Sequence, residues 1–160
     1  RRSSDLVLAS GIVNSFGDLL KQVVALAAFM PIIAGMGGNI GTQSATIVIR
    51  GLTTGRVDLR EVGKMIFKQI RVGLLLGLAY GLGLSILVQI LYPASGIMVG
   101  VVVGLGIGSV MLLAAFMGTI APLLLDKLKT DPAIATGPFV TTSIDILGML
   151  IYFSIASAML

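Results

Sequence analysis

A single carboxylate, Asp145, lies inside the last long apolar stretch of the chain, residues 139–160, which contains no other charged side chain. A helix of about 20 such residues spans the hydrocarbon core of a bilayer. Placing an aspartate at the centre of such a helix costs roughly 2.5–3.5 kcal/mol, so the side chain usually faces a partner, a wet cavity or an ion. The other long apolar stretches carry no Lys or Arg to pair with it, and a bound cation is therefore the leading hypothesis.

Two hydroxyl groups accompany this carboxylate. Thr141 and Thr142 precede Asp145 by four and three residues, which places their side chains on the same side of a helix. The functional interpretation is a cation-binding carboxylate that lines a pore together with these hydroxyls. The alternative is a buried aspartate that is hydrogen-bonded to a neighbouring helix.

A second polar segment interrupts an apolar stretch at residues 35–46, where Asn39 and Gln43 are four residues apart. Proline tends to kink a helix, and irregular backbone is tolerated at membrane depth only inside protein or beside water. We therefore predict that the second helix is broken at Pro31 and over the glycine-rich residues 35–41, with backbone carbonyls that could face an ion. The alternative is a glycine-rich packing surface.

The composition indicates an all-α integral membrane protein. Of 160 residues, 56% are hydrophobic and only 11% are charged, whereas soluble domains carry roughly 25% charged residues. The chain has no Cys and no His, which excludes thiolate chemistry, imidazole catalysis and Cys/His metal sites. A bound metal would have to be a hard cation with oxygen ligands. We expect no enzyme activity and no nucleic-acid partner.

The apolar segments predict a five-helix transmembrane bundle. The first, residues 6–13, is short or truncated here, and the second begins near Asp18. Three further spans are predicted over residues 72–92, 97–125 and 133–160. Glycines recur every fourth residue on two of them, which predicts close helix packing; these are Gly73, Gly77, Gly81, Gly100, Gly104 and Gly108.

The basic residues predict the orientation in a cell membrane. Six of the eleven Lys and Arg residues lie between residues 50 and 71, and Lys127 and Lys129 lie in a later connection. Cytoplasmic loops are enriched in Lys and Arg, so both connections and the N-terminus are expected in the cytoplasm and the C-terminus outside. The amphipathic residues 58–71 are expected to rest on the anionic inner leaflet, or alternatively to dock a cytoplasmic regulatory domain.

Two long motifs resemble a known family. The segment Pro31-Ile-Ile-Ala-Gly-Met-Gly-Gly-Asn-Ile-Gly-Thr-Gln-Ser-Ala-Thr46, followed by Arg50, is similar to the signature of the MgtE magnesium channel family. The segment Ser143-Ile-Asp145-Ile-Leu-Gly148-Met-Leu-Ile-Tyr152 resembles that family's final helix, and Asp145 falls on its intramembrane acidic residue. The resemblance extends over nearly the whole chain.

The resemblance implies a homodimeric Mg²⁺ channel with five transmembrane helices per subunit and a pore at the dimer interface. The second and fifth helices would line the pore, and Asp145 of both subunits would hold a largely hydrated Mg²⁺. Carried over by motif, four further residues would lie near the ion: Asn39, Gly41, Thr42 and Gln43.

The resemblance also implies what the chain lacks. We expect residues 1–160 to form a single transmembrane domain without the family's cytoplasmic N-terminal and CBS regulatory domains. The resemblance implies a cytoplasmic regulatory domain of this kind as a partner. The sequence does not decide between Mg²⁺ and Mn²⁺, Co²⁺ or Ca²⁺, all of which accept oxygen ligands. A proton-coupled divalent-cation exchanger and a structural membrane subunit are the alternative functions.

Overall fold

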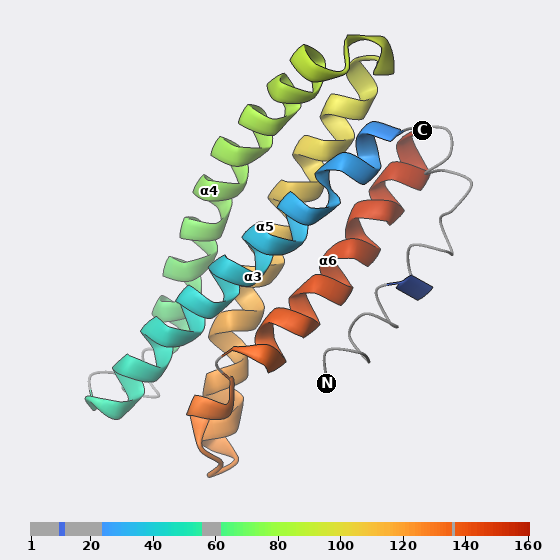
Figure 1. Cartoon of the computed structure of the whole chain (residues 1–160). Helices are drawn as coiled ribbons and strands as arrows, with labels where there is room; N and C mark the ends of the chain where they lie inside the picture. The colour runs from blue at the N-terminus through green and yellow to red at the C-terminus, as the bar shows by residue number, and fades with distance from the viewer. Residues whose placement is uncertain (1–9, 12–23, 56–61, 136) are drawn as a thin grey trace.

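The computed structural model describes residues 10–11, 24–55, 62–135 and 137–160, and this part of the chain is helical without strands. It contains four long helices that form a bundle (Figure 1). They are α3 (Val24–Thr53), α4 (Val62–Leu91), α5 (Ile97–Lys127) and α6 (Pro138–Met159), with the 3-10 turns η2 (Pro93–Ser95) and η3 (Pro132–Ala135). The prediction of an all-α fold is confirmed.

Each of the four long helices is long and apolar enough to cross a membrane. Three of them agree with predicted spans, and α3 contains the segment with the glycine-rich motif. The predicted short first helix lies outside the described residues except for Ser10 and Gly11, and so does the predicted helix start near Asp18. The count of five spans therefore stays a prediction.

The helix α5 lies at the centre of the bundle. It packs against α3, α4 and α6, while α3 also packs against α6 and barely touches α4. Successive helices run in opposite directions, as Figure 1 shows. The core is built mainly from one side of α5, whose fully buried side chains include Val102, Val103, Ile107, Val110, Met111 and Ala114.

The glycines of α4 and α5 form the contact between these two helices. A Cβ atom added to Gly81 would lie 2.8 Å from the carbonyl oxygen of Gly104, and one added to Gly77 would lie 3.0 Å from that of Gly108. A Cβ atom added to Gly73 would crowd Ala115, and one added to Gly100 would crowd the backbone of Ser85. Small residues thus let the two backbones approach closely, which is how transmembrane helices commonly pack.

The predicted break in the second helix is not present. α3 runs without interruption through Pro31 and through residues 35–41. A proline removes one backbone hydrogen bond, and the remaining bonds carry the helix past it. Within the glycine-rich part, the hydroxyl of Thr42 donates to the carbonyl of Gly38 at 2.9 Å, and Thr46 donates to Thr42 at 2.8 Å. The glycines serve packing, because Gly37, Gly38 and Gly41 are buried against neighbouring helices.

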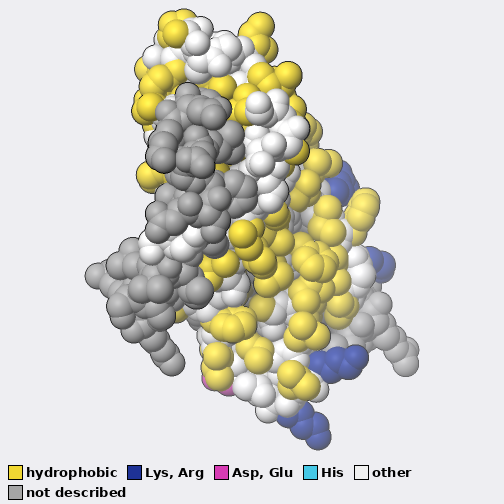
Figure 2. All heavy atoms as spheres, turned by 90° about the vertical axis from the view of Figure 1, so that its right-hand side faces the viewer, with side chains coloured by type: hydrophobic (Ala, Val, Ile, Leu, Met, Phe, Trp, Pro, Cys, Tyr) yellow, Lys and Arg dark blue, Asp and Glu magenta, His cyan; other side chains and the backbone are white. Residues whose placement is uncertain are grey.

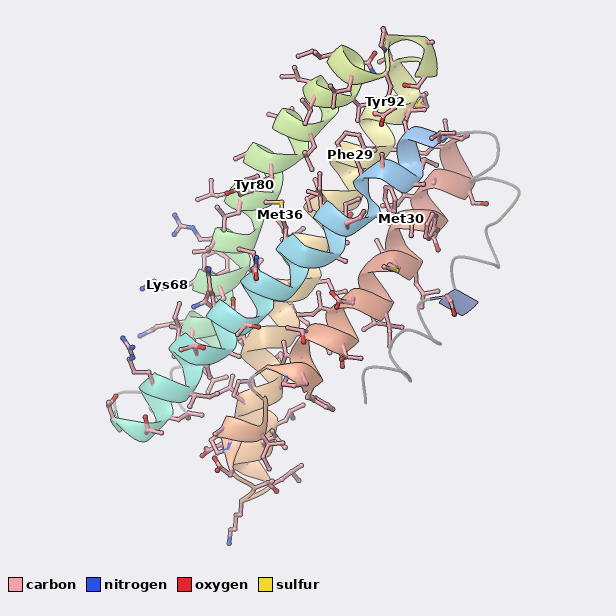
Figure 3. All side chains as sticks on the ribbon, in the orientation of Figure 1. Phe29, Met30, Met36, Lys68, Tyr80 and Tyr92 are labelled. Carbon is pink, nitrogen blue, oxygen red and sulfur yellow. The ribbon has the colours of Figure 1, made fainter. Side chains whose placement is uncertain are left out.

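The basic stretch continues directly into a spanning helix. Lys64, Lys68 and Arg71 belong to the first turns of α4, which then runs on to Leu91 as one helix. The described part of residues 58–71 is therefore an extension of the span and not a separate helix lying on the surface. Lys68 points away from the bundle (Figure 3).

The basic side chains lie at one end of the bundle. Because α3 and α5 end where α4 begins, the described Lys and Arg residues gather there. Figure 2 shows basic side chains toward the lower part of one face and an uncharged upper end. They are Arg50, Lys64, Lys68, Arg71, Lys127 and Lys129.

The opposite end of the bundle is held by aromatic contacts. Phe29 of α3 and Tyr92 before η2 meet edge to face, with ring centroids 6.4 Å apart (Figure 3). The hydroxyl of Tyr152 on α6 donates to the carbonyl of Leu26 at 3.1 Å. This end therefore fixes α3 against α6 and against the turn between α4 and α5.

Candidate functional site

A strip of small and polar residues runs along the exposed side of α3. Gly35, Asn39, Gln43 and Thr46 follow one another at intervals of four, four and three residues, and all four are exposed. This spacing places them on one face of the helix. We call these four residues the polar strip. The opposite face of α3 is buried in the core.

Asp145 lies beside the polar strip, on α6. A Cβ atom added to Gly38 would lie 3.8 Å from the Oδ1 atom of Asp145 and 3.5 Å from the Cγ2 atom of Thr141. The missing side chain at Gly38 therefore lets the polar side of α6 approach α3. Gly38 is midway along α3, so the carboxylate is at the depth of the middle of that span. We call this contact of Gly38, Thr141 and Asp145 the α3–α6 seam.

The start of α6 sets the direction of these side chains. Gly137 adopts a positive φ of 70° immediately before the helix, and Pro138 occupies the first turn. Proline is favoured there because its missing N–H group would have no partner in the helix. Asp145 then follows two turns later, one turn after Thr141, so both face the seam.

The threonine hydroxyls at the seam leave oxygen atoms available as acceptors. Thr141 donates its hydroxyl hydrogen to the carbonyl of Gly137 at 3.0 Å, and Thr42 donates to Gly38. Because the hydrogens are used within the helices, the oxygen lone pairs can face water or an ion. Thr142 is partly exposed next to Thr141.

Asn39 and Gln43 do not lie at the seam but on the adjacent side of α3. Both line a crevice of about 250 Å³ that α3 forms with α4, together with Tyr80. Tyr80 was not among the predicted site residues, and its signal in the sequence was a phenol in the middle of a predicted span. The candidate residues therefore form two groups on adjacent sides of one helix.

Gly41 is placed in the packing and not on the exposed face. A Cβ atom there would collide with Ile144, and the carbonyl of Gly41 is covered by Gly118. Its position is therefore that of a close contact among α3, α5 and α6. A buried hydrogen bond of 3.4 Å between Ser44 and Gln69 also joins α3 to α4, and it was not predicted from the sequence.

Among the described residues, Asp145 is the carboxylate that lies in this region. Within residues 10–11, 24–55, 62–135 and 137–160, no group of three or more acidic, His or Cys side chains could hold a metal ion together. A cation at Asp145 would thus take its other ligands from water, from neutral oxygens or from a second copy of the chain. Mg²⁺ suits such a site, because it keeps several of its waters and binds through one or two carboxylates.

Comparisons with known proteins point to one family. The family model described as MgtE, divalent cation transporter, matches residues 30–155. The magnesium transporter MgtE of Bacillus subtilis (strain 168) is 42% identical over 152 residues, which cover 95% of this chain and 33% of that protein. The magnesium transporter MgtE of Thermus thermophilus is 38% identical over 154 residues, covering 96% and 34% respectively.

A third relative, the magnesium transporter MgtE of Enterococcus faecalis, is 34% identical over 154 residues, covering 92% of this chain and 32% of that protein. The chain thus spans about one third of the length of these curated relatives. The matched residues include α4 and α5 entirely, most of α3, and the part of α6 that carries Asp145.

Proposed function

Since the chain belongs to the MgtE family of divalent cation transporters, we propose that it is a membrane channel domain that conducts largely hydrated Mg²⁺. The observation that carries the proposal is the position of Asp145 at the α3–α6 seam, halfway along α3. An intramembrane carboxylate is costly and is retained where it serves an ion pathway. The transport is passive and involves no covalent chemistry.

The ligand chemistry favours a hydrated ion. Mg²⁺ loses its waters reluctantly and needs near-octahedral oxygen ligands. Asp145 would attract the ion by charge, while Thr141, Thr142 and Thr42 would accept hydrogen bonds from its waters. Asn39 and Gln43 line the crevice on the adjacent side of α3, so they would contact waters of the ion at another point of the pathway. Hard oxygen ligands also accept Mn²⁺, Co²⁺ or Ca²⁺, and competition with these ions during transport would rank them.

A second copy of the chain would complete the pathway. The polar strip is exposed in the single chain, and polar groups of a span avoid lipid by facing protein or water. Two chains related by a twofold axis along α3 and α6 would enclose the strip and bring two Asp145 carboxylates to one ion. Closed twofold dimers are the commonest protein assemblies.

The basic end of the bundle would face the cytoplasm, by the enrichment of Lys and Arg in cytoplasmic loops. The C-terminus of α6 lies at the other end in Figure 1, so it would face the outside of the cell. A cytoplasmic N-terminus and a regulatory cytoplasmic domain as partner stay proposals that the family resemblance supports.

We expect liposomes that contain this chain to take up Mg²⁺ down its concentration gradient. Uptake should be unaffected by an imposed pH gradient, because a channel couples no proton to the ion. A Mg²⁺-sensitive dye trapped inside the vesicles measures the rate, with protein-free vesicles as the control. Uphill Mg²⁺ movement driven by the pH gradient would instead identify a proton-coupled exchanger, and a well-folded dimer without any flux would favour a structural subunit.

We expect Asn39→Cys to be joined to a second copy by a short bifunctional maleimide in membranes. The chain contains no native cysteine, so each variant carries one thiol. Leu75→Cys is the control, because Leu75 is 64% exposed on α4 and lies outside the polar strip. Gel analysis should show a dimer band for Asn39→Cys alone. Equal crosslinking of both variants, or of Leu75→Cys only, would contradict the proposed dimer axis.

A further inference from the structure

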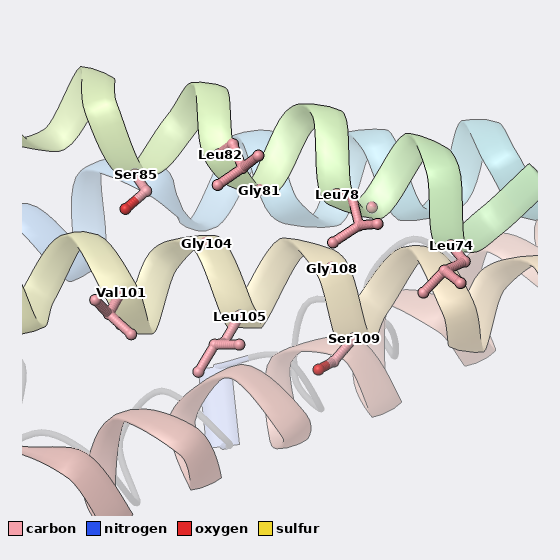
Figure 4. A pocket seen from close by; sticks show the side chains of 11 residues that line it. Leu74, Leu78, Gly81, Leu82, Ser85, Val101, Gly104, Leu105, Gly108 and Ser109 are labelled. Atoms are coloured by element: carbon pink, nitrogen blue, oxygen red, sulfur yellow. The ribbon is translucent and has the colours of Figure 1, made fainter.

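An apolar groove of about 320 Å³ lies on the outer surface between α4 and α5 (Figure 4). Its floor is the line along which the glycines of the two helices meet. Its walls are leucines of α4 and apolar side chains of α5, and its two hydroxyl side chains are Ser85 and Ser109. The wall residues are Leu74, Leu78, Leu82, Val101 and Leu105.

The groove is open in the described part of the chain. Leu78 is 55% exposed, Leu82 is 65% exposed and Leu105 is 49% exposed. Covering an apolar side chain lowers the free energy when that side chain would otherwise face water. In a membrane it would otherwise face bulk lipid, which is equally apolar. A specific occupant must therefore gain its binding preference over bulk lipid from its headgroup or its charge, because apolar contact alone does not provide one.

The length of the groove matches one leaflet. From Leu74 to Ser85 the α4 helix rises about 16 Å. This is close to half of the ~30 Å hydrocarbon core of a bilayer. The groove begins at Leu74, one turn past Arg71, and it ends at Ser85, about 9 Å before the end of α4 at Leu91.

Positive charge lies directly at the shallow end of the groove. Arg71 lies three residues before Leu74 and seven residues before Leu78. Lys64 lies seven residues before Arg71, so Lys64, Arg71 and Leu78 share one side of α4. The guanidinium of Arg71 lies 6.0 Å from the ring centre of the exposed Phe67. Within α4, no acidic residue lies beside Arg71.

We propose that the groove and Arg71 together bind one anionic phospholipid of the leaflet at the basic end. One acyl chain lies in the groove between the leucines of α4 and Leu105. The phosphate lies at Arg71, with Lys64 and Lys68 adding positive charge nearby. Charge complementarity selects an anionic headgroup over a zwitterionic one, and the groove fixes the position of the chain.

A transmembrane helix from a second copy is a poorer occupant. A helix with its side chains is about 10–12 Å across and would bury its whole ~30 Å length, whereas the groove is about 16 Å long. An apolar helix would also leave Arg71 without a counter-charge.

Fluorescence quenching tests the proposal, because the chain contains no tryptophan. Leu78→Trp places a single fluorophore on the wall of the groove, and Ile90→Trp places one at an exposed position of the same helix that is outside the groove and 19 residues from Arg71. Each variant is reconstituted in phosphatidylcholine vesicles that contain a minor, equal fraction of brominated phosphatidylglycerol or brominated phosphatidylcholine. We expect phosphatidylglycerol to quench Leu78→Trp severalfold more strongly than phosphatidylcholine, and both lipids to quench Ile90→Trp equally.

Neutralising the basic residue separates headgroup binding from general lipid contact. One cationic side chain near an anionic surface is worth about a fivefold preference, so Arg71→Gln combined with Leu78→Trp should lower the preference for phosphatidylglycerol about fivefold. Leu82→Trp gives an independent measurement if Leu78→Trp does not fold. Equal quenching by both lipids, or a preference that survives Arg71→Gln, would overturn the proposal. Shielding of Leu78→Trp from both lipids would do so too, in favour of a second copy in the groove.

Discussion

Replacing Asp145 by asparagine is expected to remove nearly all Mg²⁺ flux while the dimer still assembles. The change keeps the size of the side chain and its capacity for hydrogen bonds but removes one negative charge from each subunit. A divalent cation about 5 Å from one carboxylate gains about 1.7 kcal/mol even at the dielectric constant of water. Two carboxylates would thus contribute about 3 kcal/mol, which is roughly a hundredfold in ion occupancy.

The matched control is Asp126→Asn. This change removes the same charge at the basic end of the bundle, in the last turns of α5 and away from the seam. Flux should stay close to that of the original chain. Mg²⁺ uptake into liposomes gives the rates, and crosslinking of Asn39→Cys reports whether the dimer is present. Unchanged uptake by Asp145→Asn would remove this carboxylate from the mechanism, and a lost dimer would assign it to assembly.

Local spacing was sufficient to predict that Thr141 and Asp145 share one face of α6. Asp145 and Thr141 are one helical turn apart, so their common face follows from helix geometry alone. A charge in an otherwise uncharged stretch is equally visible in the sequence. The glycine spacing in α4 and α5 also needs no knowledge of the partner, because it indicates a close approach whichever helix supplies it.

The α3 side could not be predicted in the same way, because its conformation depends on neighbouring helices. A glycine-rich segment unwinds or packs according to what lies against it. Here Val110 and Ile144 fill the space at Gly37, and Thr141 lies against Gly38. These contacts join residues more than 70 positions apart. The crevice that Asn39 shares with Tyr80 has the same origin, because the sequence does not state which side of α4 faces α3.

We expect Gly118→Ala to destabilise the bundle strongly, because Gly118 of α5 packs directly against the backbone of Gly41 on α3. A Cβ atom on Gly118 would collide with the carbonyl oxygen of Gly41 and lie 2.9–3.0 Å from its backbone carbons. No side chain can rotate away, so the two helices must separate. Overpacking typically costs 1–3 kcal/mol, and contact with backbone puts this site at about the upper end of that range. A fall in the thermal midpoint, followed by size-exclusion chromatography in detergent, measures the effect.

Gly83→Ala is the matched control, since Gly83 is an exposed position of α4 with nothing within 4 Å of an added Cβ. Alanine is favoured over glycine inside a helix by about 1 kcal/mol, so this variant should be as stable as the original chain or more stable. If Gly118→Ala proved equally stable, α3 would have room to move without cost.

Where Gly118→Ala folds, the shift of α3 should also weaken Mg²⁺ flux, because α3 carries Gly38 away from Asp145. The same substitution thus tests whether the packing of α5 holds the two sides of the proposed ion site together.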